Sequence, residues 1–349
     1  MVTKEAVLEA LNGVKDPDLN KSIVEIGGVR EVQVKEGLVS LKIALAKTGT
    51  SGQMQVQQQI VNVVKEAGAE SVGLRFEELT DEEQSKHGGM QEAPKGKTTL
   101  LSPENTTKFI AVTSGKGGVG KSTVSVNLAT TLARLGKKVG IVDADIYGFS
   151  VPDMMGIEER PKVQGERIIP VERFGVKVIS MGFFVEDNAP IIWRGPMLGK
   201  MLNQFFTDVE WGDLDYLVLD LPPGTGDVAL DVHTMLPHSK EILVTTPHAT
   251  AAFVAARAGA MAIKTNHQIL GIVENMAYFE SKVTREREFV FGQGGGERLA
   301  EELKSELLGQ IPLGQPEINE DDFAPSIYAE EHPIGQIYEN IAKRVIEKA

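Results

Sequence analysis

The chain contains no cysteine among its 349 residues. This absence excludes disulfide bonds, thiolate nucleophiles and metal clusters ligated by the chain's own cysteines. Long apolar runs are also missing, because no stretch approaches the roughly 18 residues that a membrane-spanning helix needs. The first residues, MVTKEAVLEALNGV, form an amphipathic pattern without the basic-then-apolar order of a signal peptide. We therefore expect a cytoplasmic protein that does not interact with a membrane.

An excess of positive charge is missing as well. The chain has 36 Lys and Arg against 49 Asp and Glu, a net charge of −13, and its pI is about 5.1. This balance disfavours a general binder of polyanions such as nucleic acid. Contact with DNA would need a local basic cluster, for which Lys137, Lys138, Arg285 and Arg287 are the candidates.

What the chain does contain is a glycine-rich stretch at residues 109–123, FIAVTSGKGGVGKST. An apolar run leads into the glycines, and a helical pattern over residues 121–135 follows them. The spacing Gly-x-x-x-x-Gly-Lys-Ser is that of a P-loop, in which backbone N–H groups and a helix N-terminus hold phosphate oxygens. We therefore expect ATP and Mg²⁺ as cofactors, with Lys121 reaching the β- and γ-phosphates and Ser122 holding the metal ion. The expected nucleotide-binding residues of the loop are Gly115, Lys116, Gly117, Gly118, Val119, Gly120, Lys121, Ser122 and Thr123.

A second lysine, Lys116, follows the first glycine of this loop. In this respect the loop resembles the deviant P-loop of the MinD and ParA class of ATPases. The resemblance implies that Lys116 reaches across a nucleotide-sandwich homodimer to the partner's phosphates. A cation placed there would stabilise the charge that develops on the transferred phosphoryl group. We expect Lys116 and Lys121 to be catalytic in a weak ATPase that forms a homodimer in its ATP state.

Strands and helices alternate after this loop. The expected strands cover residues 109–113, 137–144, 175–182, 214–220, 241–247, 268–275 and 308–313. Alternation of this kind predicts an α/β fold with a doubly wound, mostly parallel sheet. Residues 108–349 are therefore expected to form a P-loop ATPase domain.

Several polar residues fall where these strands end, which is the ligand edge of an open α/β sheet. Asp220 ends an apolar strand and is expected to hold a Mg²⁺-bound water. Resemblance to the same ATPase class implies that Asp143 positions the attacking water and that Asp145 helps to form the dimer and the metal shell. The alternative for both is capping of the next helix. The resemblance also implies that Asn275 reads the adenine edge and that Pro312 flanks the base.

The region before the ATPase domain has a different organisation. Residues 1–87 are expected to form a small α+β domain, with helices over 2–11 and 53–67 and strands over 29–34, 38–45 and 71–77. Residues 88–107 are rich in Gly, Pro, Thr and Lys and are expected to be a flexible linker.

The segment VKDPDLN and the hairpin–helix order of the first domain resemble the MIP18-type domain. That family has a Thr-x-x-Gly-Cys-Pro loop before the second helix. The matching segment here, residues 46–53, reads AKTGTSGQ, with Thr50 or Ser51 at the place of the cysteine. The family's thiol chemistry is therefore not carried over, and a helix-capping role is expected for this loop.

The motifs GKGGVGKSTVSVNLA, DADIYGFSVPDMMG, WRGPM, LDLPPGTGD and ENM together resemble the Mrp family, P-loop ATPases usually described as iron–sulfur cluster carriers. The resemblance covers nearly the whole chain. That family normally has Cys-x-x-Cys shortly after ENM, and two such pairs bridge a cluster across the dimer. Residues 278–292 here read YFESKVTREREFVFG, so the expected ATP site is complete while the cysteine site is missing.

Two functions follow from this departure. The first is a nucleotide switch that regulates DNA or a protein target, such as a DNA-binding transcriptional regulator, because the chain resembles the cysteine-free SalA-type branch of regulators. The second is an iron–sulfur cluster carrier with other ligands. His233, His238 and His248 lie in one stretch, but their spacing specifies no metal, so the regulator is the expected function and a bound cluster is not expected.

Residues 333–348 have apolar positions at helical spacing. A membrane anchor of the MinD kind is one alternative for this helix. Docking on the sheet is expected instead, because Glu339 and Glu347 dilute the basic face that an anchor needs.

Overall fold

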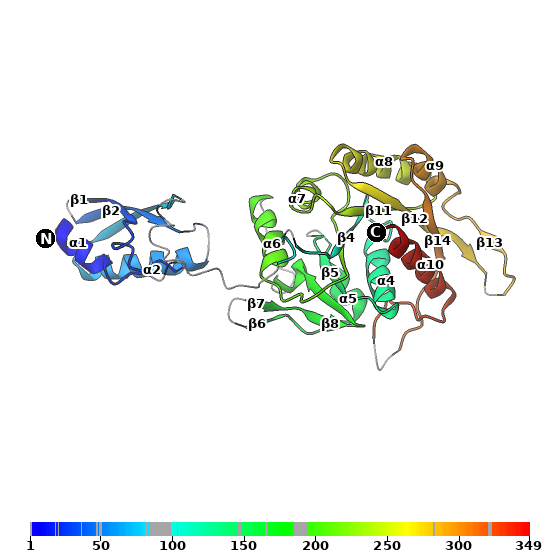
Figure 1. The fold of residues 1–349 in the computed structure, drawn as a ribbon, viewed down its shortest axis with the longest axis horizontal. Helices are drawn as coiled ribbons and strands as arrows, with labels where there is room; N and C mark the ends of the chain where they lie inside the picture. Colours follow the sequence, from blue (N-terminus) through cyan, green and yellow to red (C-terminus); the bar gives the residue numbers. More distant parts are fainter. Residues whose placement is uncertain are drawn as a thin grey trace. The chain divides into compact units, whose positions relative to one another are not determined.

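The structure, a computed structural model, describes residues 2–17, 19, 21–35, 37–46, 48, 51–80, 83, 99–102, 104–145, 148–164, 167–184, 195–281, 283–319 and 323–349, without the side chains of residues 51–55, 195–198 and 227. The chain forms two compact units, Met1–Lys97 and Thr98–Ala349, and each is described by itself (Figure 1). Some expectations concern residues outside this description: the linker over residues 88–98, the loop position Thr50, residues 18 and 20 of VKDPDLN, residues 146–147 of DADIYGFSVPDMMG and residues 193–194 of WRGPM.

In the first unit, three strands of the described residues form a sheet that packs against two helices. The elements are α1 (Lys4–Leu11), β1 (Val29–Lys35), β2 (Leu38–Leu45), α2 (Ser51–Glu66) and β3 (Ser71–Glu78). β1 and β2 form an antiparallel hairpin, and β2 pairs in parallel with β3. Apolar side chains from both layers, including Leu11, Ile43 and Ile60, make the core. The expected small α+β arrangement is therefore present.

In the second unit, nine strands of the described residues form one sheet in the order β13-β12-β11-β4-β10-β5-β9-β8, with β14 also pairing with β12. β8 and β13 pair antiparallel with their neighbours, and the remaining pairs are parallel. The strands are β4 (Lys108–Ser114), β5 (Val139–Asp143), β8 (Val171–Arg173), β9 (Val176–Ser180), β10 (Tyr216–Asp220), β11 (Lys240–Thr245), β12 (Gln268–Glu280), β13 (Arg287–Glu288) and β14 (Leu307–Leu313). A separate ribbon pairs β6 (Lys162–Gln164) with β7 (Arg167–Ile169).

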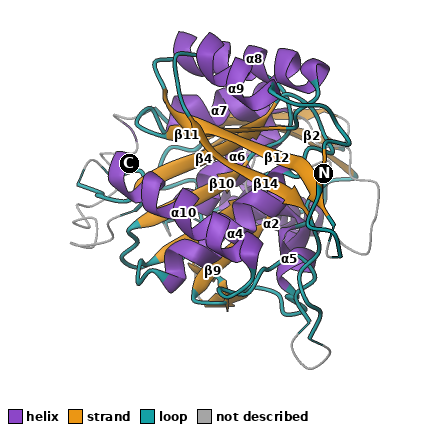
Figure 2. Cartoon of the chain, turned by 90° about the vertical axis from the view of Figure 1, so that its right-hand side faces the viewer, coloured by secondary structure: helices purple, strands orange, loops and turns teal. Residues whose placement is uncertain are grey.

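Helices cover both faces of this sheet (Figure 2). They are α4 (Lys121–Arg134), α5 (Val151–Met155), the 3₁₀ turn η1 (Met181–Phe184), α6 (Gly195–Thr207), α7 (Asp227–Met235), α8 (Ala249–Lys264), α9 (Gly295–Glu302) and α10 (Pro333–Lys348). Alternate residues of a strand point to opposite faces. Val218 of β10 accordingly joins the core under α4 and α10, whereas Leu217 and Leu219 join the core under α6 and α7. The sheet is doubly wound and mostly parallel, as its sequence predicts.

The described part of the expected linker, residues 99–102 and 104–107, packs against the second unit. Leu100 is buried in the same core as Phe206, and its N–H donates to the Phe206 carbonyl at 3.3 Å. The buried Thr107 hydroxyl donates to the Leu214 carbonyl at 3.0 Å. These residues therefore extend the second unit toward the N-terminus.

The C-terminal helix α10 docks on the sheet as expected. It packs against α4 and β14, and Ile334, Tyr338 and Ile341 are buried in the shared core. Within the described part of the chain, no helix is long and apolar enough to cross a membrane.

Candidate functional site

The glycine-rich loop connects the end of β4 to the start of α4. Gly118 and Gly120 have φ angles of +79° and +82°, which residues with a side chain rarely adopt. Gly115 lies against α8, because a Cβ added to it would be 2.3 Å from the backbone nitrogen of Ala255. The loop therefore needs glycine both for its backbone conformation and for the close approach of a neighbouring helix.

A cavity of about 400 Å³ opens at this loop, a size typical of small-molecule sites. It lies at the ends of β4, β5 and β10, the edge of the sheet where ligands of doubly wound folds bind. The lining residues are Ser114, Lys116, Gly117, Gly118, Gly120, Lys121, Ser122, Asp145, Gly148, Met154 and Pro223. Of the expected loop residues, Gly115, Val119 and Thr123 are not in this lining, and the sequence analysis assigns no site role to the lining residues Ser114, Gly148 and Met154.

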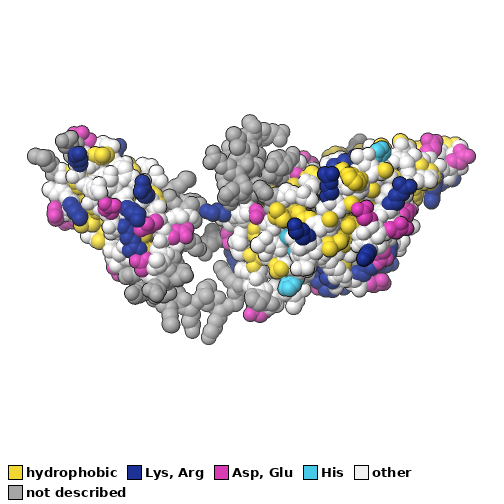
Figure 3. Space-filling view, turned by 90° about the horizontal axis from the view of Figure 1, so that it is seen from above, with side chains coloured by type: hydrophobic (Ala, Val, Ile, Leu, Met, Phe, Trp, Pro, Cys, Tyr) yellow, Lys and Arg dark blue, Asp and Glu magenta, His cyan; other side chains and the backbone are white. Residues whose placement is uncertain are grey.

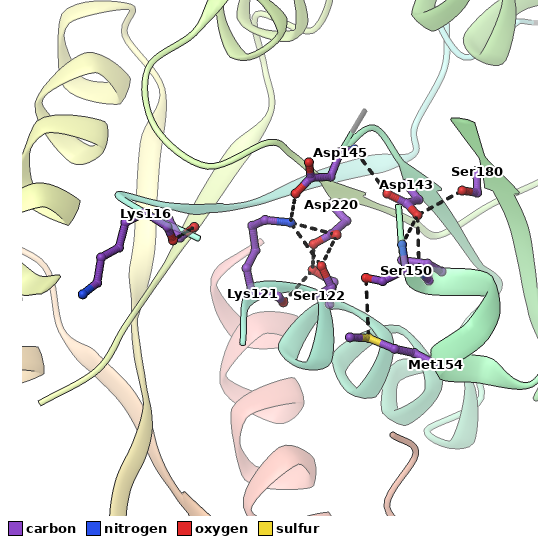
Figure 4. A network of polar contacts seen from close by, with 12 residues as sticks. Lys116, Lys121, Ser122, Asp143, Asp145, Ser150, Met154, Ser180 and Asp220 are labelled. Carbon is purple, nitrogen blue, oxygen red and sulfur yellow. Dashed lines mark hydrogen bonds and ion pairs between the residues drawn. The ribbon is translucent and has the colours of Figure 1, made fainter. Parts of the chain in front are cut away.

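Lys121 lies at the centre of a charged cluster in this cavity (Figure 4). Its ammonium is 2.8 Å from Oδ2 of Asp220 and 3.5 Å from Oδ2 of Asp145. The Ser122 hydroxyl donates to the same Asp220 oxygen at 2.6 Å. Lys121 and Asp220 are almost wholly buried. The structure thus gathers the expected phosphate cation and both expected metal-holding residues at one point.

A second hydroxyl, which the sequence analysis did not consider, completes the contacts of Asp220. Ser125 donates to Oδ1 of Asp220 at 2.6 Å. Ser125 follows Lys121 by four residues on α4, so both project from the same face of the helix. That spacing was the available signal in the sequence.

Asp143 does not line the cavity, contrary to its expected role in positioning a water molecule. It is wholly buried. Its oxygens accept hydrogen bonds from the N–H groups of Asp145, Ser150 and Val151 and from the Ser180 hydroxyl, at 3.0 to 3.2 Å. The carboxylate therefore holds the start of α5 and the end of β9, close to the alternative of a helix cap.

The environment of Asp143 also perturbs its protonation. Burial raises its pKa to about 7, and the negative charge of Asp220 acts in the same direction, whereas hydrogen bonds from Ser180 and Val151 oppose the rise. The sheet register explains this coupling, because Asp143 and Asp220 are directly paired on the adjacent strands β5 and β10.

The two lysines of the loop point in different directions (Figure 4). Lys121 points into the charged cluster, whereas the exposed side chain of Lys116 extends away from it. Lys116 therefore does not contact the cluster formed by Lys121, Asp145 and Asp220.

Asn275 contacts the loop itself. Its amide nitrogen donates to the Val119 carbonyl at 2.9 Å, and the side chain is almost wholly buried. A Cβ added to Gly120 would lie 2.1 Å from the same nitrogen. This contact uses one of the two amide N–H donors of Asn275 and holds the side chain against the loop, so its contact with an adenine edge stays a prediction. Pro312 follows Ile311, which pairs with Asn275 on the neighbouring strand.

The three histidines considered as metal ligands have separate roles. His233 is buried 2.6 Å from Glu241, His248 caps the start of α8 by accepting from the Thr250 N–H, and His238 is exposed. Among the described residues, no group of three or more His, Asp or Glu side chains is arranged to hold a metal ion.

The four basic candidates for DNA contact do not form a cluster. Lys137 and Lys138 precede β5, whereas Arg285 and Arg287 follow β12. The two strands run in the same direction, so these pairs lie at opposite edges of the sheet. Arg285 and Arg287 are also 3.9 and 3.1 Å from Glu280. On the face seen in Figure 3, Lys and Arg side chains lie in small separate groups among acidic and apolar ones.

Comparison with known proteins gives two family matches. The ParA family model, described as NUBPL iron-transfer P-loop NTPase, matches residues 105–346. A model described as iron-sulfur cluster assembly protein matches residues 4–73.

Two curated relatives carry the name iron-sulfur cluster carrier protein. The chain is 64% identical over 351 residues to the protein from Bacillus subtilis, covering 100% of this chain and 99% of the relative. It is 41% identical over 345 residues to the protein from Mycobacterium leprae, covering 95% and 90%.

Among solved structures, a nucleotide-binding protein from Archaeoglobus fulgidus in complex with ADP matches with a TM-score of 0.52 and 39% identity, covering 68% of this chain and 87% of that one. The cell division ATPase MinD of Pyrococcus furiosus matches with a TM-score of 0.51 and 22% identity, covering 69% and 99%. The second likeness supports the fold alone.

Proposed function

The chain belongs to the ParA family of NUBPL-type iron-transfer P-loop NTPases, and from this premise we propose that it binds and hydrolyses ATP with Mg²⁺ as a homodimeric nucleotide switch. The observation that carries the proposal is that Lys121 and Ser122, which line the cavity beside the glycine-rich loop, both contact the buried carboxylate of Asp220. The ADP complex of the Archaeoglobus fulgidus protein supports a nucleotide as the ligand.

The residues present fit a magnesium ion. Ser122 lines the cavity, and its hydroxyl lies 2.6 Å from a carboxylate oxygen of Asp220 directly behind it. Mg²⁺ prefers such oxygen ligands, with waters filling its other positions. In our proposal Ser122 holds the ion directly and Asp220 holds it through water. The bound ion would neutralise charge on the β- and γ-phosphate oxygens.

The loop and its lysines have distinct proposed roles. Backbone N–H groups of residues 115–123 and the start of α4 bind the phosphates. Lys121 leaves its carboxylate partners to bind the β- and γ-phosphates, and Lys116 contacts the phosphates of the partner subunit. Asn275 supports the loop through Val119, and Pro312 remains the proposed neighbour of the base.

The attacking water is assigned differently from the sequence expectation. Asp145 lines the cavity, whereas Asp143 is buried behind it with its oxygens occupied by donors. We therefore propose Asp145 as the residue that positions the water and Asp143 as the residue that holds the Asp145 backbone in place. A general base must lie within hydrogen-bonding reach of the proton that it accepts. The position of Asp145 at the cavity therefore outweighs the role that the resemblance implies for Asp143.

The output of the switch has two candidates. The names of the relatives favour carriage of an iron–sulfur cluster, and none of the comparisons favours the expected transcriptional regulator. However, the chain has no cysteine, and its described residues offer no other cluster of metal ligands. The cluster does not fit this chain alone, so carriage would require thiolates from another molecule.

The nucleotide proposal is tested by calorimetric titration of ATP with Mg²⁺ and by phosphate release. Lys121→Ala should weaken ATP binding by roughly 10- to 100-fold, because it removes a charge-assisted contact with phosphate. Lys116→Ala, which changes an exposed lysine of the same loop, is the matched control and should retain binding. Unchanged affinity in Lys121→Ala would contradict the assignment.

Cluster carriage is tested by iron and sulfide content after anaerobic reconstitution, with and without a small thiol such as glutathione. We expect no stable cluster on the protein alone. Retention of stoichiometric iron and sulfide only with the thiol would support carriage, whereas failure in both conditions would leave the nucleotide switch with another output.

A further inference from the structure

Asp220 is held by two serines of the same helix, and only one of them belongs to the P-loop motif. We propose that the other, Ser125, is a positioning residue that fixes the Asp220 carboxylate so that one defined oxygen faces the metal-binding position. This inference rests on the proposed function, because it concerns the Mg²⁺ site of that ATPase.

The contacts of Asp220 divide cleanly between its oxygens. Oδ2 receives the Ser122 hydroxyl at 2.6 Å and the Lys121 ammonium at 2.8 Å, and both of these residues line the cavity. Oδ1 receives the Ser125 hydroxyl at 2.6 Å. Ser125 is wholly buried and is not among the lining residues. One oxygen of the buried carboxylate is therefore held by Ser125, and the other contacts two residues that line the cavity.

The Ser125 hydroxyl has a second acceptor, the carbonyl of Lys121 at 3.1 Å. A hydroxyl has one proton to donate, and the shorter contact with an ionised oxygen is the stronger one. We therefore assign the Ser125 hydroxyl proton to the hydrogen bond with Oδ1 of Asp220. A serine that only bonded back to its own helix would lack this short contact with another element.

This arrangement matters most when nucleotide binds. Lys121 must then leave Oδ2 for the phosphates, and Asp220 remains wholly buried with Asp143 as its neighbour on β5. The Ser125 hydroxyl holds Oδ1 throughout, so it keeps the Asp220 carboxylate oriented while Oδ2 exchanges its partner.

The test is calorimetric titration of Mg²⁺ into full-length protein saturated with ADP, and of ADP into protein without Mg²⁺. Ser125→Ala should weaken Mg²⁺ binding by about 10-fold, the usual size for one hydrogen bond to a charged group. ADP binding without Mg²⁺ should change less than about 2-fold, since the P-loop is intact. Ser125→Thr, which keeps the hydroxyl, should restore most of the Mg²⁺ affinity.

The matched control is Thr130→Val on the same helix. Thr130 is wholly buried, and its hydroxyl has no hydrogen-bond partner among the described residues. This variant should bind Mg²⁺ like the wild-type protein. Thermal melting of every variant without nucleotide reports any general damage to the fold.

Equal Mg²⁺ affinity in Ser125→Ala and wild type, or an equal loss in Thr130→Val, would overturn the inference. A loss in Ser125→Ala that Ser125→Thr does not reverse would also overturn it, because the hydroxyl would then not be the cause. If the wild-type protein itself binds no Mg²⁺ with ADP, the proposed function is wrong and this inference falls with it.

Discussion

At the scale of single residues, the pairing of Asp143 with Asp220 sets two carboxylates side by side in the interior. Asp143 has an ordinary pKa of 3.8, which its buried position raises to about 7. A raised pKa in the folded state means that the folded protein binds the proton more tightly than the unfolded chain does. The stabilising contribution of this group is therefore fully present below its unfolded pKa and is lost as the pH rises through 7.

This sign leads to a prediction for Asp143→Asn, which removes the titrating group. Between about pH 5 and pH 8, the free energy of unfolding of the wild-type protein should fall relative to that of the variant. Urea denaturation at both pH values measures the difference. Parallel pH dependence of the two proteins would show that Asp143 has no raised pKa in the folded state.

Asn275 allows a second prediction, which separates support of the loop from recognition of the base. Because its amide holds the Val119 carbonyl, Asn275→Ala should weaken ATP and GTP binding alike, by roughly 5- to 10-fold for one lost hydrogen bond. Competition titrations with both nucleotides measure the ratio. A loss confined to ATP would instead indicate that Asn275 reads the adenine edge.

The positions of the site residues were predictable where a sequence motif fixes them, and less so where the pairing register of the strands decides them. Lys121, Ser122 and Asp220 meet as expected. The position of Asp143 depends on its pairing with Asp220 and on donors from Ser150 and Ser180. No local pattern in the sequence reports such contacts between separate elements.

At the scale of elements, α10 stabilises the fold mainly through its buried face. Ile341 is almost wholly buried against the sheet, and Gly309 of β14 faces it so closely that an added Cβ would lie 2.8 Å from its side chain. Ile341→Ala should lower the free energy of unfolding by about 2–5 kcal/mol, because it leaves a cavity. Lys343→Ala on the exposed face is the control and should change it by less than about 0.5 kcal/mol. Similar effects of both variants in urea denaturation would contradict the docking of α10.

The bounds of helices and strands in the structure agree closely with those expected from the sequence where the apolar pattern is long. The strand predicted over residues 268–275 is longer in the structure, where β12 continues to Glu280 and pairs there with β13. β13 itself has two residues, and β6, β7 and β8 have three each. Segments of this length show no periodicity, so tertiary pairing rather than local pattern defines them.

At the scale of the whole molecule, the parallel sheet explains which of the predicted site residues lie close together and which lie far apart. The glycine-rich loop, Asp145 and Asp220 follow strands that run in one direction, so they meet at one edge. The same topology separates Lys138 from Arg287 and removes the basic cluster that DNA binding needed. The sequence alone does not show which of these residues lie close together, because that depends on the order of the strands in the sheet.

The homodimer proposal gives the last prediction. Lys116 lies on an exposed loop and points away from its own subunit's cluster, so a role in hydrolysis requires a second copy. Lys116→Ala should lower kcat by at least about 10-fold with little change in ATP affinity, the pattern of a contact made in the transition state. Light scattering with and without ATP should show a dimer only with ATP. A dimer of unchanged mass in both conditions would indicate a constitutive interface.

The contact between Lys121 and Asp220 has a consequence for which ligands the site admits. In this arrangement the loop's cation and the buried carboxylate neutralise each other. A phosphate that attracts Lys121 leaves Asp220 without its counter-charge, and an unpaired buried charge is costly. Electroneutrality is restored only if another cation arrives with the phosphate. The protein should therefore discriminate between a nucleotide and its metal complex before any bond is broken.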